Sequence, residues 1–302
     1  MRIRTAAPAI TLALLAIASP ARAGEEAPRF EPVYRVNHEE QVNGSAAGQQ
    51  PEMVAARVNP NPEGFNFAQR PGEHPLMPAL RFAKLGLQNI DANIQDYSAL
   101  LYKQERVNDV LNEEEVAFVK VRHQPFSVYM YFLKPHKGRE CLYVDPQNGE
   151  KGKLYAMDCG WRRRLGVFPL DPDGALAMKG QKYPITKIGI RNLTTELIDV
   201  ATNDTKFAEC EVVVGDNVIM QRPVKQITVT HPVPRRNFRF HKAEVFIDKE
   251  MQVPIRYAAY LWPKNPGEAA PLEEAYTYVN IKTNNGFTDA DFDKDNPNLF
   301  KK

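Results

Sequence analysis

Residues 126–133 read Phe-Ser-Val-Tyr-Met-Tyr-Phe-Leu, an apolar run with the alternation of a β-strand. Successive side chains of a strand point to opposite faces, so one face carries Val128, Met130 and Phe132, and the other carries Tyr129 and Tyr131. A strand that is apolar on both faces is covered on both sides. We therefore predict that Val128, Met130 and Phe132 form the wall of an apolar ligand cavity; ordinary core beneath a helix is the alternative.

Further strand-like segments lie on both sides of this run along the chain. They are rich in Val, Tyr and Phe, and turn residues such as Pro and Asn-Gly separate them, which favours an antiparallel meander. The predicted strands cover residues 97–107, 114–123, 126–133, 139–145, 151–158, 209–214, 218–230, 238–248, 253–262 and 272–283.

Two segments have the periodicity of amphipathic helices, residues 77–94 and 185–200. A sheet of about ten strands curls, and helices can then cover its concave face. The predicted fold class is therefore α+β, with one large, curved, unclosed antiparallel sheet and helices packed on the concave face. A cavity remains wherever the helices do not fill that face.

The N-terminal part of the chain predicts export. Residues 1–23 have two arginines, an apolar run and an Ala-Arg-Ala cleavage site, the pattern of a cleaved signal peptide. Residues 24–75 are rich in proline and lack a hydrophobic period, so we expect a disordered leader or tether with short docking pieces such as Phe65. The folded domain is predicted to span residues 76–302, without a membrane span, in the periplasm or outside the cell.

Several blocks resemble a family of secreted bacterial proteins that is described only as a domain of unknown function. The blocks are Tyr102-Lys-Gln-Glu-Arg-Val107, Pro125-Phe-Ser-Val-Tyr-Met130, Gly138-Arg-Glu-Cys-Leu-Tyr-Val144 and Tyr183-Pro-Ile-Thr-Lys-Ile-Gly-Ile190. The family looks like a branch of the LolA-like clan of periplasmic lipoprotein carriers and lipid-binding proteins. This resemblance implies an unclosed β-barrel with helices as a lid over a cavity for acyl chains. The long leader and an arginine-rich insertion depart from that pattern.

The insertion begins at Trp161, which three arginines follow, Arg162, Arg163 and Arg164. An aromatic ring and three guanidinium groups at a cavity mouth could hold an anionic head group. We predict them as ligand-binding residues, and a solvated turn is the alternative. With 39 basic and 37 acidic residues in 302, the chain has no overall field that would attract nucleic acid.

Catalytic and metal-binding patterns are weak in this sequence. It contains no Gly-x-Ser-x-Gly, His-Glu-x-x-His or phosphate-loop motif. Glu105 and Glu140 could approach each other as a catalytic carboxylate pair, but cross-strand ion pairs are the more ordinary interpretation. The sequence predicts no catalytic residue, no metal and no cofactor.

We therefore predict a non-catalytic exported protein that binds a lipid or an acylated protein in an apolar cavity. An envelope protein is a further expected partner. The alternative is a structural or adaptor module of the envelope whose own side chains fill the core. An envelope hydrolase is a third hypothesis, which lacks a recognisable nucleophile or acid pair.

Overall fold

The computed structural model describes residues 64–207 and 210–301. The signal peptide predicted over residues 1–23, and the leader up to residue 63, lie outside the described residues. Among those described, no helix is long and apolar enough to cross a membrane.

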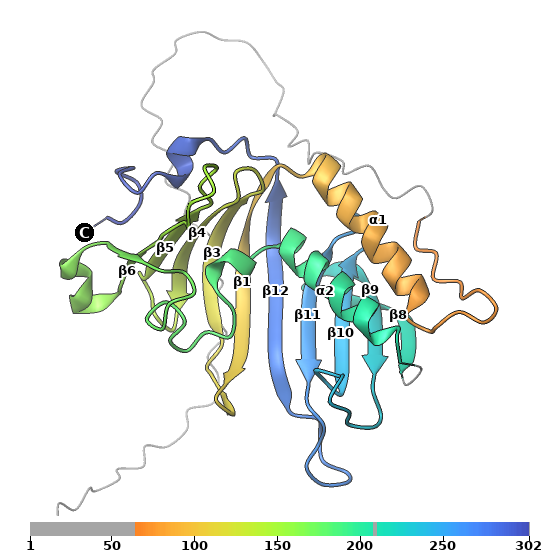
Figure 1. Ribbon diagram of the computed structural model, residues 1–302. Helices are drawn as coiled ribbons and strands as arrows, with labels where there is room; N and C mark the ends of the chain where they lie inside the picture. The colour runs from red at the N-terminus through yellow and green to blue at the C-terminus, as the bar shows by residue number, and fades with distance from the viewer. Residues whose placement is uncertain (1–63, 208–209, 302) are drawn as a thin grey trace, which may run out of the picture. The chain divides into compact units, whose positions relative to one another are not determined.

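A twelve-stranded antiparallel sheet forms the body of the domain (Figure 1). Along the sheet the strands follow the order β7-β6-β5-β4-β3-β1-β12-β11-β10-β9-β8, and β2 pairs with β1 beside this path. The two outer strands do not pair with each other, so the sheet is open, as predicted. The strands are β1 (Asp96–Val107), β2 (Val110–Leu111), β3 (Glu115–Arg122), β4 (Ser127–Lys134), β5 (Glu140–Val144), β6 (Leu154–Met157), β7 (Phe168–Leu170), β8 (Glu211–Ile219), β9 (Arg222–Thr230), β10 (Lys242–Asp248), β11 (Pro254–Tyr260) and β12 (Leu272–Thr283).

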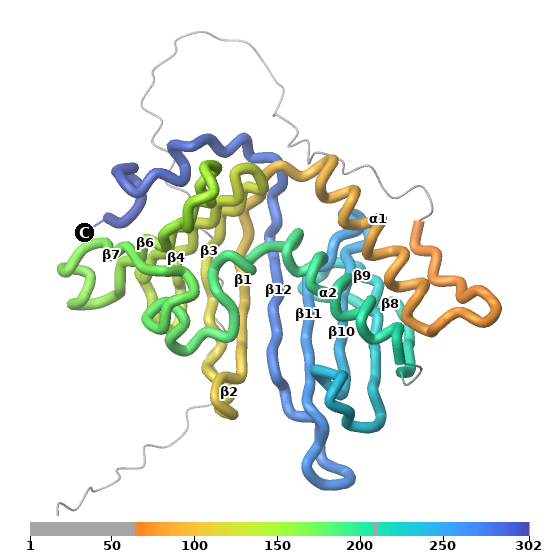
Figure 2. Tube along the Cα trace, in the orientation of Figure 1, coloured from red at the N-terminus to blue at the C-terminus, as the bar shows by residue number. Residues whose placement is uncertain are grey.

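Two α-helices cover one face of the sheet and contact each other, α1 (Met77–Asn93) and α2 (Ile190–Asp204). Figures 1 and 2 show them over the part formed by β8 to β12. We call the side of the whole sheet on which the two helices lie the helical face. Three short 3-10 helices complete the elements, η1 (Gly160–Leu165), η2 (Ile185–Lys187) and η3 (Asp289–Phe292).

Strand β4 is covered on both sides, which confirms the prediction from residues 126–133. On the helical face Val128, Met130 and Phe132 belong to the main core, together with Ile90 and Ile94. On the opposite face Tyr129 packs in a second core cluster that the C-terminal segment closes, with Phe292, Leu299 and Phe300.

The second helix begins later than its apolar period suggests. Residues 185–187 form η2, and α2 starts at Ile190 after Gly189, whose φ of 120° favours glycine. Two tyrosine hydroxyls from the sheet accept the first free N–H groups: Tyr278 from Gly189 at 3.1 Å and Tyr97 from Ile190 at 2.9 Å. These hydrogen bonds from the sheet, and not the apolar period alone, therefore determine the residue at which α2 begins.

The break expected between residues 214 and 218 is wrong. Strand β8 continues through Gly215, and the chain turns at Met220 and Gln221, both with positive φ. A two-residue turn with positive φ at both positions matches the twist of a hairpin, although Asn and Gly are the usual residues there.

Packing also extends into residues that the sequence assigned to the leader. Phe65 and Phe67 both lie against Phe82 of α1, with ring centroids 5.2 Å from its ring. Glu73 pairs with Arg81 at 2.6 Å. Among the described residues, packed contacts therefore extend back to Phe65, before the predicted boundary at Leu76.

Candidate functional site

An apolar pocket lies between the two helices and strands β9 to β11. Its volume is about 90 Å³. The lining residues come from α1 and its start, from α2 and from the sheet: Leu76, Ala79, Leu80, Phe82, Ala83, Gly86, Thr194, Leu197, Val200, Ala201, Asp204, Ile227, Val229, Phe240, Ala243, Val245, Ile247, Gln252 and Pro254.

Small side chains leave this space open. Ala79, Ala83 and Gly86 line the pocket from α1, and Ala201 and Ala243 line it from α2 and β10. A Cβ atom added at Gly86 would lie 3.7 Å from the carbonyl oxygen of Gln252, which is an ordinary contact. The helix backbone therefore does not need to approach the sheet so closely that only glycine fits.

Polar side chains at the pocket are few, and Thr194 already donates its hydroxyl to the Ile190 carbonyl at 2.8 Å. Asp204, at the end of α2, is the single ionisable residue of the lining, and only 4% of it is exposed. Burial raises the pKa of this carboxyl to about 6. Its Oδ2 lies 3.5 Å from Nε2 of His231, a ring that is fully buried.

A cysteine, a histidine and this aspartate lie near one another, a grouping that the sequence did not suggest. Cys210 Sγ is 3.9 Å from Nε2 of His74. However, Nδ1 of His74 accepts the Leu76 N–H, so Nε2 carries the proton and donates it to the Phe207 carbonyl at 2.7 Å. Burial also raises the pKa of Cys210 to about 11. The imidazole therefore cannot act as a base toward this thiol.

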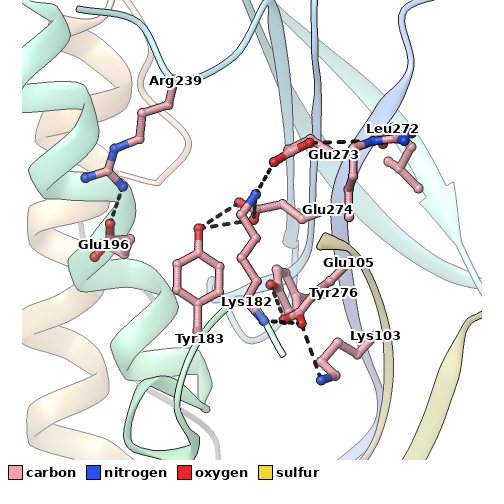
Figure 3. A network of polar contacts seen from close by, with 11 residues as sticks. Lys103, Glu105, Lys182, Tyr183, Glu196, Arg239, Leu272, Glu273, Glu274 and Tyr276 are labelled. Atoms are coloured by element: carbon pink, nitrogen blue, oxygen red, sulfur yellow. Dashed lines mark hydrogen bonds and ion pairs between the residues drawn. The ribbon is translucent and has the colours of Figure 1, made fainter. Parts of the chain in front are cut away.

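A second polar cluster lies on the helical face of β1 and β12 (Figure 3). Glu105 and Glu274 lie directly opposite each other in the register of these strands, and both are buried. The Tyr276 hydroxyl donates to Glu105 at 2.7 Å, and Lys182 Nζ lies 2.8 Å from Glu274. Burial raises the pKa of Glu274, while the ammonium of Lys182 opposes that rise.

This network ties the segment before α2 to the sheet. The Lys182 N–H donates to Glu105 at 2.8 Å, and the Tyr183 hydroxyl donates to Glu274 at 3.1 Å. On β3, Glu115 pairs with Lys103 at 2.8 Å. Each carboxylate of the cluster therefore has a charged or hydroxyl partner. Full pairing of this kind is typical of buried groups with a structural role.

The predicted cavity wall is packed core. Val128, Met130 and Phe132 are buried among Ile90, Ile94 and other core residues, and none of the three lines the pocket. The structure therefore separates the residues predicted from β4 from the open space beneath the helices. That they contact a ligand stays a prediction.

The predicted head-group residues lie in η1, between β6 and the outer strand β7, and do not line the pocket either. Arg163 turns inward and pairs with Glu140 at 2.6 Å. Trp161, Arg162 and Arg164 are exposed. Ligand binding by these four residues also stays a prediction.

The suggestion of a Glu105–Glu140 acid pair is wrong, because the two carboxylates lie on opposite faces of the sheet. Glu140 accepts the Tyr129 hydroxyl at 2.7 Å beneath the C-terminal segment, whereas Glu105 faces the helices. Ion pairs between neighbouring strands are present instead, such as Lys103–Glu115. All three cysteines are free, and residues 64–207 and 210–301 contain no group of three or more metal-ligating side chains.

The sequence analysis expected a cavity between the helices and the sheet but did not identify its lining, because the residues that leave it open are small. The spacing of Ala79, Ala83 and Gly86 places three small residues on one face of α1. That pattern was available in the sequence, but only the fold shows that Ala201 and Ala243 face the same space.

The solved structures that match this chain have low sequence identity to it and low TM-scores. A putative outer membrane lipoprotein-sorting protein domain from Vibrio parahaemolyticus is 12% identical, covering 74% of this chain and 98% of that one, with a TM-score of 0.36. The lipoprotein LppX of Mycobacterium tuberculosis is 15% identical, covering 68% and 96%, with a TM-score of 0.37. A LolA superfamily protein from Nitrosomonas europaea is 11% identical, covering 70% and 98%, with a TM-score of 0.24.

No protein of curated function matches the sequence. The profile of one family matches residues 94–300, about two thirds of the chain, and this family is described as a protein of unknown function. The match confirms the resemblance to an uncharacterised family that the blocks around β1, β4, β5 and η2 indicate. The chain belongs to the DUF1571 family.

Proposed function

We propose that this protein is exported and shelters a hydrocarbon chain of a lipid or of an acylated protein in the pocket beneath α1 and α2, without performing chemistry on it. The apolar lining of that pocket carries the proposal. A hydrocarbon chain gains about 0.8 kcal/mol for each methylene removed from water, so ten buried methylenes supply about the 8 kcal/mol of micromolar affinity.

The size of the pocket limits how it works. A cavity of about 150 Å³ holds a benzene molecule, so the 90 Å³ seen here accommodates only a few carbons. Binding of a longer chain therefore requires α1 and α2 to move apart. The same small volume favours the second candidate function, an adaptor whose core is filled by its own side chains.

Native mass spectrometry of the protein purified from an exported preparation separates the two candidates. The carrier predicts adducts whose masses match extracted lipids, and uptake of added fatty acid or acylated peptide. Ala83→Phe fills the pocket from α1 and should abolish these adducts. Ala92→Phe makes the same change at an exposed position of α1 and should keep them.

An empty protein that also takes up none of the added chains contradicts the carrier and supports the adaptor. Adducts that survive in Ala83→Phe but disappear when Met130 is shortened to Ala would move the site to β4, where the sequence placed it. Cooperative unfolding that begins above the temperature of the binding measurement shows that the fold is intact in each variant, including Met130→Ala, whose midpoint should fall.

A further inference from the structure

A second surface of the molecule combines exposed apolar and basic side chains. It is formed by η1 and β7 and contains Trp161, Arg162, Arg164, Leu165 and Phe168; we call it the η1 surface. The side chains of Trp161, Leu165 and Phe168 are 73%, 60% and 45% exposed. Single exposed apolar residues are normal on proteins, but here three within eight residues of chain concentrate exposed apolar surface in one segment.

The basic groups on this surface are largely free of counter-charges. Arg164 has no ion pair or hydrogen bond within the part of the chain that the structure describes. Arg162 reaches Asp158 at only 3.5 Å, and Arg139 holds the same carboxylate at 3.0 Å. The guanidinium of Arg162 also lies over the ring of Trp161, 5.6 Å from its centroid.

The contacts of Arg163 with Glu140 and the C-terminal segment fix the position of η1. Arg163, between the two exposed arginines, pairs with Glu140 at 2.6 Å and donates from Nε to the Lys301 carbonyl at 2.6 Å. Glu140 is itself 2% exposed. The arrangement fixes the backbone of η1, so that Trp161 and Leu165 point to solvent without a loss of core packing.

We propose that the η1 surface binds the anionic surface of a lipid bilayer. Guanidinium groups interleaved with an indole and aliphatic side chains suit the head-group region, where rings and methylene stems enter the boundary and charges stay with phosphate. Protein interfaces are also enriched in tryptophan and arginine, so direct binding to vesicles is the measurement that separates a bilayer from a protein partner. This surface lies at the β7 edge of the sheet, whereas α1 and α2 cover the β8 to β12 part (Figure 2).

The test uses the protein purified from an exported preparation, without the predicted signal peptide and with Trp262→Phe, which leaves Trp161 as the single tryptophan. It is mixed with vesicles of phosphatidylcholine alone, or with about one third phosphatidylglycerol, at low and high salt. We expect a blue shift of Trp161 fluorescence and co-sedimentation with the anionic vesicles at low salt. Arg162→Glu/Arg164→Glu should weaken this binding by roughly tenfold or more.

The matched control is Lys84→Glu/Lys187→Glu, which makes the same change in net charge at two other exposed positions and should leave binding nearly unchanged. Absence of both signals with anionic vesicles overturns the proposal, and so does an equal loss in the two charge-reversed variants. Trp161→Ala/Leu165→Ala, which removes only exposed side chains, should also reduce sedimentation; full retention there contradicts the role of the apolar groups.

Discussion

The layer between the helices and the sheet is packed at one end and hollow at the other. At the packed end Ile90, Ile94 and Ile190 belong to one core cluster with Val128 and Met130, and every one of these residues is almost fully buried. At the hollow end the corresponding positions of α1 are Ala79, Ala83 and Gly86, which face Val229 and Ala243. Both ends use the same two helices and the same sheet.

The difference shows that side-chain size along one helix face decides whether this fold closes its core. The same two helices bound both ends. The isoleucines at 90 and 94 fill the layer at one end, and alanine and glycine leave it open at the other. An open apolar pocket in this architecture therefore needs no special backbone.

The largest expected effect on the free energy of unfolding comes from introducing a glutamate at each end. Met130→Glu places an unpaired carboxylate in packed core and should cost about 5 kcal/mol in the free energy of unfolding, enough to unfold an ordinary domain. Leu197→Glu, at the half-buried pocket lining, should cost about 2 kcal/mol, because the side chain can reach solvent. Urea denaturation measures both, and equal costs would show that the ends do not differ.

Asp204 should make the stability of the protein depend on pH, through its raised pKa at the hollow end. Its folded pKa of about 6 lies above the unfolded value of 3.8, so its contribution to stability is present below pH 4 and lost as pH rises through 6. The total change is about 3 kcal/mol. Asp204→Asn removes it, so unfolding free energies of parent and variant should diverge between pH 4 and 7. Parallel curves would contradict the raised pKa, and Asp199→Asn, exposed on the same helix, is the control.

Enlarging an alanine should lower stability at the packed end and leave it almost unchanged at the hollow end. Ala117, fully buried in β3 at the packed end, has no space beside it, so Ala117→Val should cost about 2 kcal/mol through overpacking. Ala243→Val extends into the pocket and should change stability by less than about 0.5 kcal/mol. Thermal unfolding of the two variants gives the comparison, and a similar loss at both positions would mean that the pocket is not open.

The smallest effect concerns two glycines. Gly86→Ala in the middle of α1 should stabilise the protein by about 0.5–1 kcal/mol, because the added Cβ makes only an ordinary contact. Gly189→Ala should destabilise it, since φ is 120° and the Cβ would lie 3.2 Å from the Tyr97 hydroxyl. A loss of stability in Gly86→Ala would show that the helix already sits at its closest approach.

Periodicity and turn chemistry predicted most of the fold. The alternation in residues 126–133 gave a strand that is buried on both faces, and α1 lies within one residue of its predicted span. The errors have local causes: Gly189 delays α2, and β8 continues through Gly215 because its cross-strand pairing with Gln226 outweighs the turn propensity of that residue.

The candidate site was less predictable, because a pocket depends on what several distant segments leave unfilled. Arg163 illustrates the limit, since its sequence context is the same as that of Arg162 and Arg164. Only the fold shows that it turns inward to Glu140 while its neighbours remain exposed. Residue type indicated the chemistry there but not the direction of each side chain.

The tyrosine hydroxyls that accept the first N–H groups of α2 make one end of this helix a pivot. Tyr97 and Tyr278 hold that end to the central strands, while the pocket-lining residues Ala201 and Asp204 lie near the other. Fifteen residues of helix form a lever of about 22 Å. A rotation of about 10° around the pivot moves its far end by about 4 Å, so a small angular change, without unfolding any turn, is enough to widen the pocket.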